Sequence, residues 1–151
     1  INISPLKLSS YLNWKYIDRP YSKIEALAIR KDGEIAGFVV LGISSAMGYP
    51  EGTIIDISSD PEDKLSIYSL CKGAIDYFKE RKVHSIKCCL TDPRFVKIFK
   101  KLLFFKVSGA YPFTIANIKK AKDQNYIMDI NNWHLTSGDS DGHMFEMDPI
   151  L

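Results

Sequence analysis

The feature that most constrains the fold is an Asp-Gly pair between two runs of strand-forming residues. Residues 22–30 and 35–42 both read as strands, and Asp32 and Gly33 lie between them. A two-residue hairpin turn needs a positive φ at both central positions, and Asp-Gly is one of the pairs that meets this need. The sequence therefore predicts a β-hairpin, which forms the antiparallel part of a sheet.

Two helices are marked by Asp-Pro pairs downstream of a third strand, which we expect over residues 53–58. Asp60 and Asp92 suit the N-cap, and the prolines that follow them suit the first helical position. Apolar residues then recur at helical spacing, which predicts a buried face on each helix. The first face consists of Ile67, Leu70, Cys71, Ala74 and Phe78, and the second of Phe95, Ile98, Phe99 and Leu102.

The other predicted elements are a helix over residues 6–17 and strands over 85–90, 106–118 and 133–136. A hairpin followed by strand–helix–strand crossovers gives a mixed sheet with helices on both faces. The predicted fold class is therefore α/β (α+β), with a mixed, mostly antiparallel central sheet.

Composition limits the possible partners. The chain has 151 residues, which suits a single domain over residues 1–151. Its net charge of +2 and its dispersed Lys and Arg residues do not indicate nucleic acid as a partner. No apolar run reaches the roughly 20 residues that span a membrane. Three cysteines without C-x-x-C spacing indicate free thiols, so the expected compartment is the cytoplasm.

The order of elements over residues 22–118 resembles the acyl-CoA N-acyltransferase (GNAT) superfamily. KDGEIAGF at 31–38 is similar to the family's dG-x-ivGf hairpin, and FKKLLF at 99–104 sits where the family has Y-x-K-L-G-F. Residues 53–58 then correspond to the strand before the cofactor helix. The resemblance implies a GNAT-like fold, acetyl-CoA as acyl donor, and a small amine or a peptide amine as acceptor.

The end segments are similar to the second halves of two-part GNAT proteins. This similarity lies in residues 11–16 and 133–141. In such proteins the first half carries the standard cofactor site. Because no initiator Met precedes Ile1, the chain is expected to be a piece of a longer protein, with a partner GNAT domain upstream of Ile1.

The resemblance places the cofactor between two splayed strands, with its pyrophosphate on a glycine-rich loop before a helix. Backbone N–H groups at a helix N-terminus bind phosphate oxygens, and glycine lets the backbone come close. The cofactor-binding positions that correspond here are Ile57, Ser58, Ser59 and Lys64. The segment 58–65 has no glycine, Pro61 lacks an N–H, and three carboxylates would oppose an anion. The sequence thus predicts a self-capped helix and a degenerate cofactor loop.

The family's general acid is a tyrosine, and Phe99 stands at its position. Leu103 replaces the glycine that follows in the family pattern, and both changes are interpreted as core packing. Asp56 is the candidate catalytic base, because a carboxylate could relay a proton from an amine. The alternative is that Asp56 is exposed or hydrogen-bonded to a neighbour. Tyr111 is the candidate replacement for the missing phenol.

Two other groups of residues suggest chemistry only superficially. The set His134, Asp139, Ser140, Asp141 and His143 looks like a triad or a metal site, but 138–142 has the composition of a turn. Cys88 and Cys89 are adjacent in a strand and face opposite sides, so they cannot chelate one metal together. No metal site is predicted.

Three functions remain open from the sequence. The first is an acetyl-CoA-dependent N-acetyltransferase, or a domain of one, that transfers an acyl group to an amine. The second is a non-catalytic GNAT-like module that binds substrate or packs against a catalytic partner domain. The third is a small-molecule sensor that uses the groove between the splayed strands.

Overall fold

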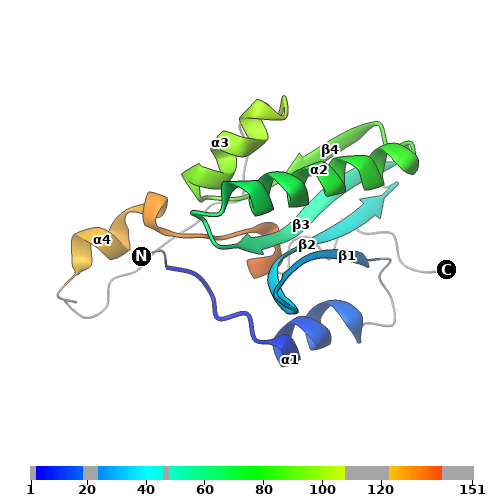
Figure 1. Ribbon diagram of the computed structural model, residues 1–151. Coiled ribbons are helices and arrows are strands. Elements are labelled where there is room, and N and C mark those ends of the chain that lie inside the picture. Colours follow the sequence, from blue (N-terminus) through cyan, green and yellow to red (C-terminus); the bar gives the residue numbers. More distant parts are fainter. Residues whose placement is uncertain (1–2, 19–23, 46–47, 108–122, 141–151) are drawn as a thin grey trace.

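The computed structural model describes residues 3–18, 24–45, 48–107 and 123–140 (Figure 1). In chain order the elements are α1 (Ser9–Leu12), the π-helical turn η1 (Asn13–Ile17), β1 (Ile24–Lys31), β2 (Glu34–Ser44), β3 (Glu51–Ser59), α2 (Lys64–Glu80), β4 (Ser85–Cys88), α3 (Pro93–Lys101), α4 (Gln124–Met128), and the 3-10 turns η2 (Ile130–Asn132) and η3 (Ser137–Asp139).

The predicted hairpin is confirmed. β1 pairs antiparallel with β2, and Lys31 lies opposite Glu34 at the turn. The turn residues Asp32 and Gly33 have φ angles of 50° and 85°. Both central positions therefore use the left-handed region, as a type I′ turn requires.

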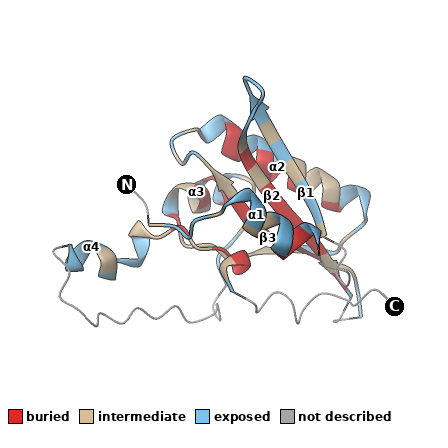
Figure 2. Ribbon diagram, turned by 90° about the horizontal axis from the view of Figure 1, so that it is seen from below, coloured by how far each residue is buried: buried red, intermediate tan, exposed pale blue. Residues whose placement is uncertain are grey.

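The sheet has the order β1-β2-β3-β4, with β2 antiparallel to β3 and β3 parallel to β4. The parallel pairing is short, and it joins Glu51–Ile54 to Ser85–Cys88. α2 and α3 cover one face of the sheet, and α1 with η1 lies on the other (Figures 1 and 2). The predicted mixed, mostly antiparallel sheet with helices on both faces is confirmed.

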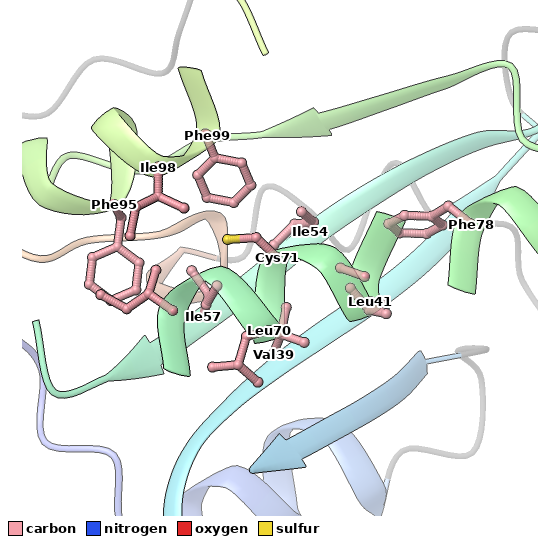
Figure 3. Packing of buried hydrophobic residues seen from close by; sticks show 12 residues of the cluster. Val39, Leu41, Ile54, Ile57, Leu70, Cys71, Phe78, Phe95, Ile98 and Phe99 are labelled. Carbon is pink, nitrogen blue, oxygen red and sulfur yellow. The ribbon is translucent and has the colours of Figure 1, made fainter. Parts of the chain in front are cut away.

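The main core lies between the sheet and the two long helices (Figure 3). Val39 and Leu41 of β2 and Ile54 and Ile57 of β3 point into it, and the predicted buried faces of α2 and α3 meet them there. Its buried members are Val39, Leu41, Ile54, Ile57, Ile67, Leu70, Cys71, Ala74, Phe78, Phe95, Ile98 and Phe99. Leu102, predicted as part of the α3 face, is only partly buried. No helix in the described part of the chain is both long and apolar enough to cross a membrane.

The predicted start of α2 is wrong, because the helix begins about one turn later than expected. Asp60 was expected as the N-cap, but its carboxylate accepts a hydrogen bond from Glu62 N at 2.9 Å and closes a local turn. The helix begins at Lys64, and Asp63 caps it through a 3.2 Å bond from Ser66 N. Both aspartates suit a cap, and Pro61 fits the turn as well as a helix. The predicted start of α3 is confirmed, since Asp92 accepts a bond from Arg94 N at 2.9 Å.

The end of α3 corrects the expectation that Leu103 packs in the core. Leu103 has a φ of 69°, and the residue is 88 % exposed. Its N–H donates to Lys100 O at 3.1 Å, and Phe104 N donates to Phe99 O at 3.0 Å. This is a Schellman motif, whose C′ position is usually glycine. The Phe99 and Phe104 rings make the accompanying apolar contact, with centroids 4.9 Å apart.

Two more predicted elements differ from the structure. The helix expected over residues 6–17 is limited to the four residues of α1 and the turn η1, and Leu8 is exposed. The strand expected over 133–136 is an extended segment that forms single bridges, Ile3 with Trp133 and Leu90 with Thr136. Most of the strand predicted over 106–118 falls outside the described residues.

Candidate functional site

β3 and β4 stop pairing after Ile54 and Cys88, and the chain that follows β4 pairs with a different segment. Thr91 N donates to Leu135 O at 3.0 Å, and Ser137 N donates to Cys89 O at 3.2 Å. This pairing brings residues 134–138 against the second half of β3, where the resemblance places the cofactor (Figure 1). The candidate site is therefore built where the two parallel strands separate.

A bulge in β3 turns Asp56 toward the α1 face of the sheet. Val40 lies opposite Asp56 and Leu41 opposite Ile54, which leaves Ile55 as the extra residue. Ile55 packs with Val40 and Tyr16 on this face. A bulge changes the direction of side chains relative to the strand, and here it places two successive side chains on one face.

Asp56 is 1 % exposed, and three side chains donate to its carboxylate. Lys7 Nζ lies 2.5 Å from Oδ1, Thr136 Oγ1 lies 2.9 Å from Oδ1, and Tyr16 Oη lies 3.0 Å from Oδ2. Burial, and then the nearby charge of Asp56, raise the pKa of Tyr16, so its phenol stays protonated and donates. Asp56 therefore matches the interpretation of a hydrogen-bonded strand carboxylate, and it could act as a base only after one donor leaves.

Asp139 extends this buried network from the C-terminal side. Its carboxylate accepts from Thr136 N at 2.8 Å and forms the capping box of η3. Asp139 Oδ1 also lies 3.2 Å from Lys7 Nζ, so one ammonium bridges Asp56 and Asp139. The carboxylate pair and the lysine bring together segments that are far apart in the sequence.

Lys15 and Gly138 complete the network. Lys15 is buried in η1, and its ammonium donates to the backbone oxygen of Gly138 and to Tyr11 Oη at 3.2 Å. A Cβ on Gly138 would lie 2.3 Å from Tyr16 Oη and 2.9 Å from Asp56 Cβ. Only glycine allows η3 to approach the bulge this closely. We call Lys7, Lys15, Tyr16, Asp56, Thr136, Gly138 and Asp139 the polar centre.

The residues predicted to bind the cofactor lie along one edge of this region. Ile57 is in the core, and its carbonyl accepts a 2.7 Å bond from His134 Nε2. Ser58 is half-buried, and Ser59 Oγ donates to Ala36 O at 3.2 Å. Lys64 is exposed at the first position of α2. The structure brings these four residues near the end of β3, but their role as cofactor ligands remains a prediction.

The N-terminus of α2 is occupied by the chain's own carboxylate. Asp63 accepts bonds from Ser66 N at 3.2 Å and from Ser66 Oγ at 2.6 Å, and it pairs with Lys31. The bonds from Lys31 and Ser66 lower the pKa of Asp63 to about 2. Lys64 N donates to Glu62 O at 3.0 Å. The predicted self-capped helix is thus observed, although its cap is Asp63.

A second buried group surrounds His134. Its Nδ1 lies 3.6 Å from Asp92 Oδ2, beyond hydrogen-bond distance, and its ring is 4.7 Å from that of Phe95. Burial alone would raise the pKa of Asp92, but His134 and bonds from Arg94 lower it to about 2. Arg94 also bonds to Glu62 at 3.0 Å. This group links the starts of α2 and α3.

His134 and Asp139 thus serve different networks, and no triad joins them. Within the described residues, no group of three or more His, Cys, Asp and Glu side chains could hold a metal ion. Asp141, His143 and the candidate acid Tyr111 lie outside the described residues. Phe99 is buried in the core, as expected.

Sequence reasoning missed four members of the polar centre, namely Lys7, Lys15, Tyr16 and Thr136. Lysine is rarely buried, so neither lysine could be separated from the surface lysines by composition. Tyr16 was placed only within the helix predicted over residues 6–17. A signal for the lysines could have come from their place beside apolar residues in a segment with helical spacing.

Comparison with solved structures shows the fold. The chain is similar to a protein described as an acetyl transferase from Pyrococcus furiosus, with 19% identity and a TM-score of 0.50, over 62% of this chain and 67% of that one. It is also similar to an aminoglycoside acetyltransferase from an uncultured soil metagenomic sample, with 11% identity and a TM-score of 0.54, over 74% and 77% of the two chains. No protein-family profile and no curated protein matches the sequence. The chain has the fold of the GNAT acetyltransferases.

Proposed function

We propose that the chain is a domain of an acetyl-CoA-dependent N-acetyltransferase, an enzyme that transfers an acyl group to a small amine or a peptide amine. Within that enzyme the chain serves as a non-catalytic GNAT-like module. It binds the acceptor or packs against a catalytic GNAT domain upstream of Ile1, and that domain holds the acetyl-CoA. The GNAT fold supports the enzyme class. The carboxylate that occupies the N-terminus of α2 supports the non-catalytic role.

The observation that carries this proposal is the carboxylate of Asp63 at the N-terminus of α2. An anion binds a helix start through free N–H groups and the positive end of the dipole. Asp63 already accepts from Ser66 N, at 3.2 Å, and it brings a negative charge of its own. Pro61 and the local turn at Asp60 precede it without any glycine. A pyrophosphate at this position would meet like charge instead of free donors.

Thermal unfolding in acetyl-CoA tests the proposal. A ligand at about 100 times its dissociation constant stabilises a protein by about 2.7 kcal/mol, which raises Tm by several degrees. We expect no rise in Tm for the chain at millimolar acetyl-CoA. Asp63→Ser is the variant to compare with the wild type. Serine also caps a helix but carries no charge, so the comparison isolates the charge of Asp63. A clear rise in wild-type Tm with acetyl-CoA, absent with inorganic pyrophosphate, would contradict the non-catalytic role.

A second candidate is that the chain is itself the N-acetyltransferase. The position of Asp56 favours it, because the β3 bulge carries a carboxylate to the point where β3 and β4 separate. In this case Asp56 is the base, Tyr111 the acid, and Ile57, Ser58, Ser59 and Lys64 contact acetyl-CoA. Thiol release from acetyl-CoA, followed with a panel of amines, tests this candidate. Activity that Asp56→Asn abolishes would establish it, and no release with any amine would exclude it.

We also propose that the protein works in a reducing compartment such as the cytoplasm. Cys71, Cys88 and Cys89 all lie in the described part of the chain, and all are free thiols. Burial raises the pKa of Cys71 to about 12 and that of Cys88 well above its usual range, so both thiols stay protonated. Trapping thiols with an alkylating agent during cell lysis tests this point. Three alkylated cysteines are expected, and a disulfide would contradict it.

A further inference from the structure

Residues 4–8 form an exposed stretch without helix or strand, and among the described residues Lys7 is the one side chain of this stretch that bonds to the sheet and to η3. Leu6 and Leu8 are 79 % and 55 % exposed, and Ser4 and Pro5 are exposed too. The Lys7 side chain, in contrast, is 8 % exposed. Of these five residues, only Lys7 reaches into the interior.

The two ends of this stretch are fixed, but its middle is not. Ile3 N donates to Asn132 O and His134 N donates to Ile3 O, both at 2.8 Å, and α1 begins at Ser9. Within the described residues, no backbone carbonyl accepts a hydrogen bond from a backbone N–H of residues 4–8, and the carbonyl of Leu8 accepts only from Leu12 N in α1, at 3.0 Å. Lys7 therefore supplies the attachment, through Asp56 at 2.5 Å and Asp139 at 3.2 Å.

We propose that residues 4–8 are a strap, which Lys7 latches over Asp56, and that release of the latch opens Asp56 to solvent. A buried carboxylate without a counter-charge is strongly unfavourable. If Lys7 leaves, the protein avoids this cost by lifting the strap, so that water reaches Asp56. Lifting breaks few other bonds of the strap. This inference goes beyond the proposed function and holds whether or not the chain binds acetyl-CoA.

The latch has a direct consequence for the polar centre. While it is closed, Lys7 takes the Asp56 oxygen that also accepts from Thr136 Oγ1. No other amine can then reach that carboxylate. Opening the strap exposes Asp56 and leaves Tyr16 and Thr136 in place, since these two belong to other segments. The strap thus controls access to the candidate base of the site.

Carboxyl labelling of the folded chain tests the latch. Carbodiimide and glycine ethyl ester modify exposed carboxylates, and mass spectrometry reads the rate at Asp56. For Lys7→Met we expect that rate to rise at least about tenfold, as for a local opening with little global change. Lys31→Met is the matched control, because it breaks the surface pair with Asp63 and should leave the labelling rate at Asp56 equal to that of the wild type. An unchanged rate at Asp56 in folded Lys7→Met would overturn the proposal.

Two further variants keep the test decisive. Chymotrypsin should cleave Lys7→Met at Leu6 and Leu8 faster than the wild type, because the strap is lifted. The double variant Lys7→Met with Asp56→Asn has no buried charge that needs water, so its cleavage rate should return toward that of the wild type. Equal cleavage of the single and double variants would contradict the latch. If Lys7→Met does not fold, Asp139→Asn decides, since it removes one of the two partners of Lys7. Labelling at Asp56 faster than wild type supports the latch, and labelling at the wild-type rate contradicts it.

Discussion

The phenol of Tyr16 donates to Asp56 Oδ2 at 3.0 Å, and both groups are buried although they lie 40 positions apart in the sequence. Tyr16 comes from the π-helical turn η1, and Asp56 comes from the bulge in β3. The π-helical turn positions the phenol of Tyr16, and the bulge positions the carboxylate of Asp56. The bond therefore fixes the N-terminal elements to the sheet at the centre of the candidate site.

Tyr16→Phe should lower the free energy of unfolding by about 1.5–3 kcal/mol, the range for a hydrogen bond to a charged group. The ring packing stays, so the loss reports the hydroxyl alone. Tyr68→Phe is the control, because Tyr68 lies on the exposed side of α2 and should change stability by less than about 0.5 kcal/mol. Urea unfolding measures both. Equal effects would show that the Tyr16–Asp56 bond contributes nothing.

Gly138→Ala and Gly73→Ala should shift stability in opposite directions. A Cβ on Gly138 would overlap Tyr16 Oη at 2.3 Å, so the substitution forces η3 away from β3 and destabilises the protein by roughly 1–3 kcal/mol. Gly73 lies within α2, and its nearest atom would be Leu27 Cδ1 at 3.5 Å, an ordinary contact. Alanine there should stabilise by about 0.5–1 kcal/mol through helix propensity. A tolerated Gly138→Ala would contradict the close packing described for the polar centre.

Leu103→Gly should raise stability by about 0.5–1 kcal/mol, because glycine adopts the φ of 69° without a steric penalty. The exposed leucine side chain loses few contacts. Leu65→Gly is the matched control, because Leu65 is also a strongly exposed leucine but lies in the first turn of α2, where glycine should destabilise. Thermal unfolding compares the two. A lower Tm for Leu103→Gly would mean that Leu103 makes contacts that stabilise the Schellman motif.

Asp92→Asn should show a stability deficit that depends on pH. In the folded protein the pKa of Asp92 is about 2, below the value of about 3.9 for an unfolded chain. Its charge therefore stabilises the fold above about pH 4, and this stability is lost as pH falls toward 2. Asparagine can still cap α3, so the deficit at pH 6 should be about 1–3 kcal/mol, from lost bonds to Arg94.

Urea midpoints at several pH values measure this effect. The difference between wild type and Asp92→Asn should shrink between pH 5 and pH 2.5. Asp76→Asn, which breaks an exposed pair with Lys72, is the control and should show a small difference at every pH. A difference for Asp92→Asn that stays constant with pH would show that the effect is not electrostatic.

The elements that local patterns determine were predicted well. Asp32 and Gly33 predicted the hairpin because turn geometry depends on two residues only, and the apolar periodicity of α2 predicted its buried face. The start of α2 could not be predicted from the sequence, because Asp60 and Asp63 are both good N-cap residues. Only the local turn that Asp60 closes with Glu62 N distinguishes them. Leu103 was assigned to the core because its replacement of the glycine in the family pattern was interpreted as packing, although glycine at that position also indicates a helix end with a positive φ.

The candidate site was predicted less completely. Asp56 was found because it is a carboxylate in the middle of the predicted third strand, where it could relay a proton from an amine. Its partners Lys7 and Thr136 are 49 and 80 positions away, and only the tertiary arrangement brings them to it. The alternation of a strand also cannot show a bulge, since one extra residue reverses the expected face.

The polar centre draws on residues near both ends of the described chain and on the middle of the sheet. Trimming the sequence past Lys7 from one side, or before Asp139 from the other, would remove a neighbour of the same buried carboxylate. Versions of the protein shortened from either end should therefore lose stability for the same reason. Their tolerance to trimming would be set by the charge balance at Asp56 and less by the number of residues removed.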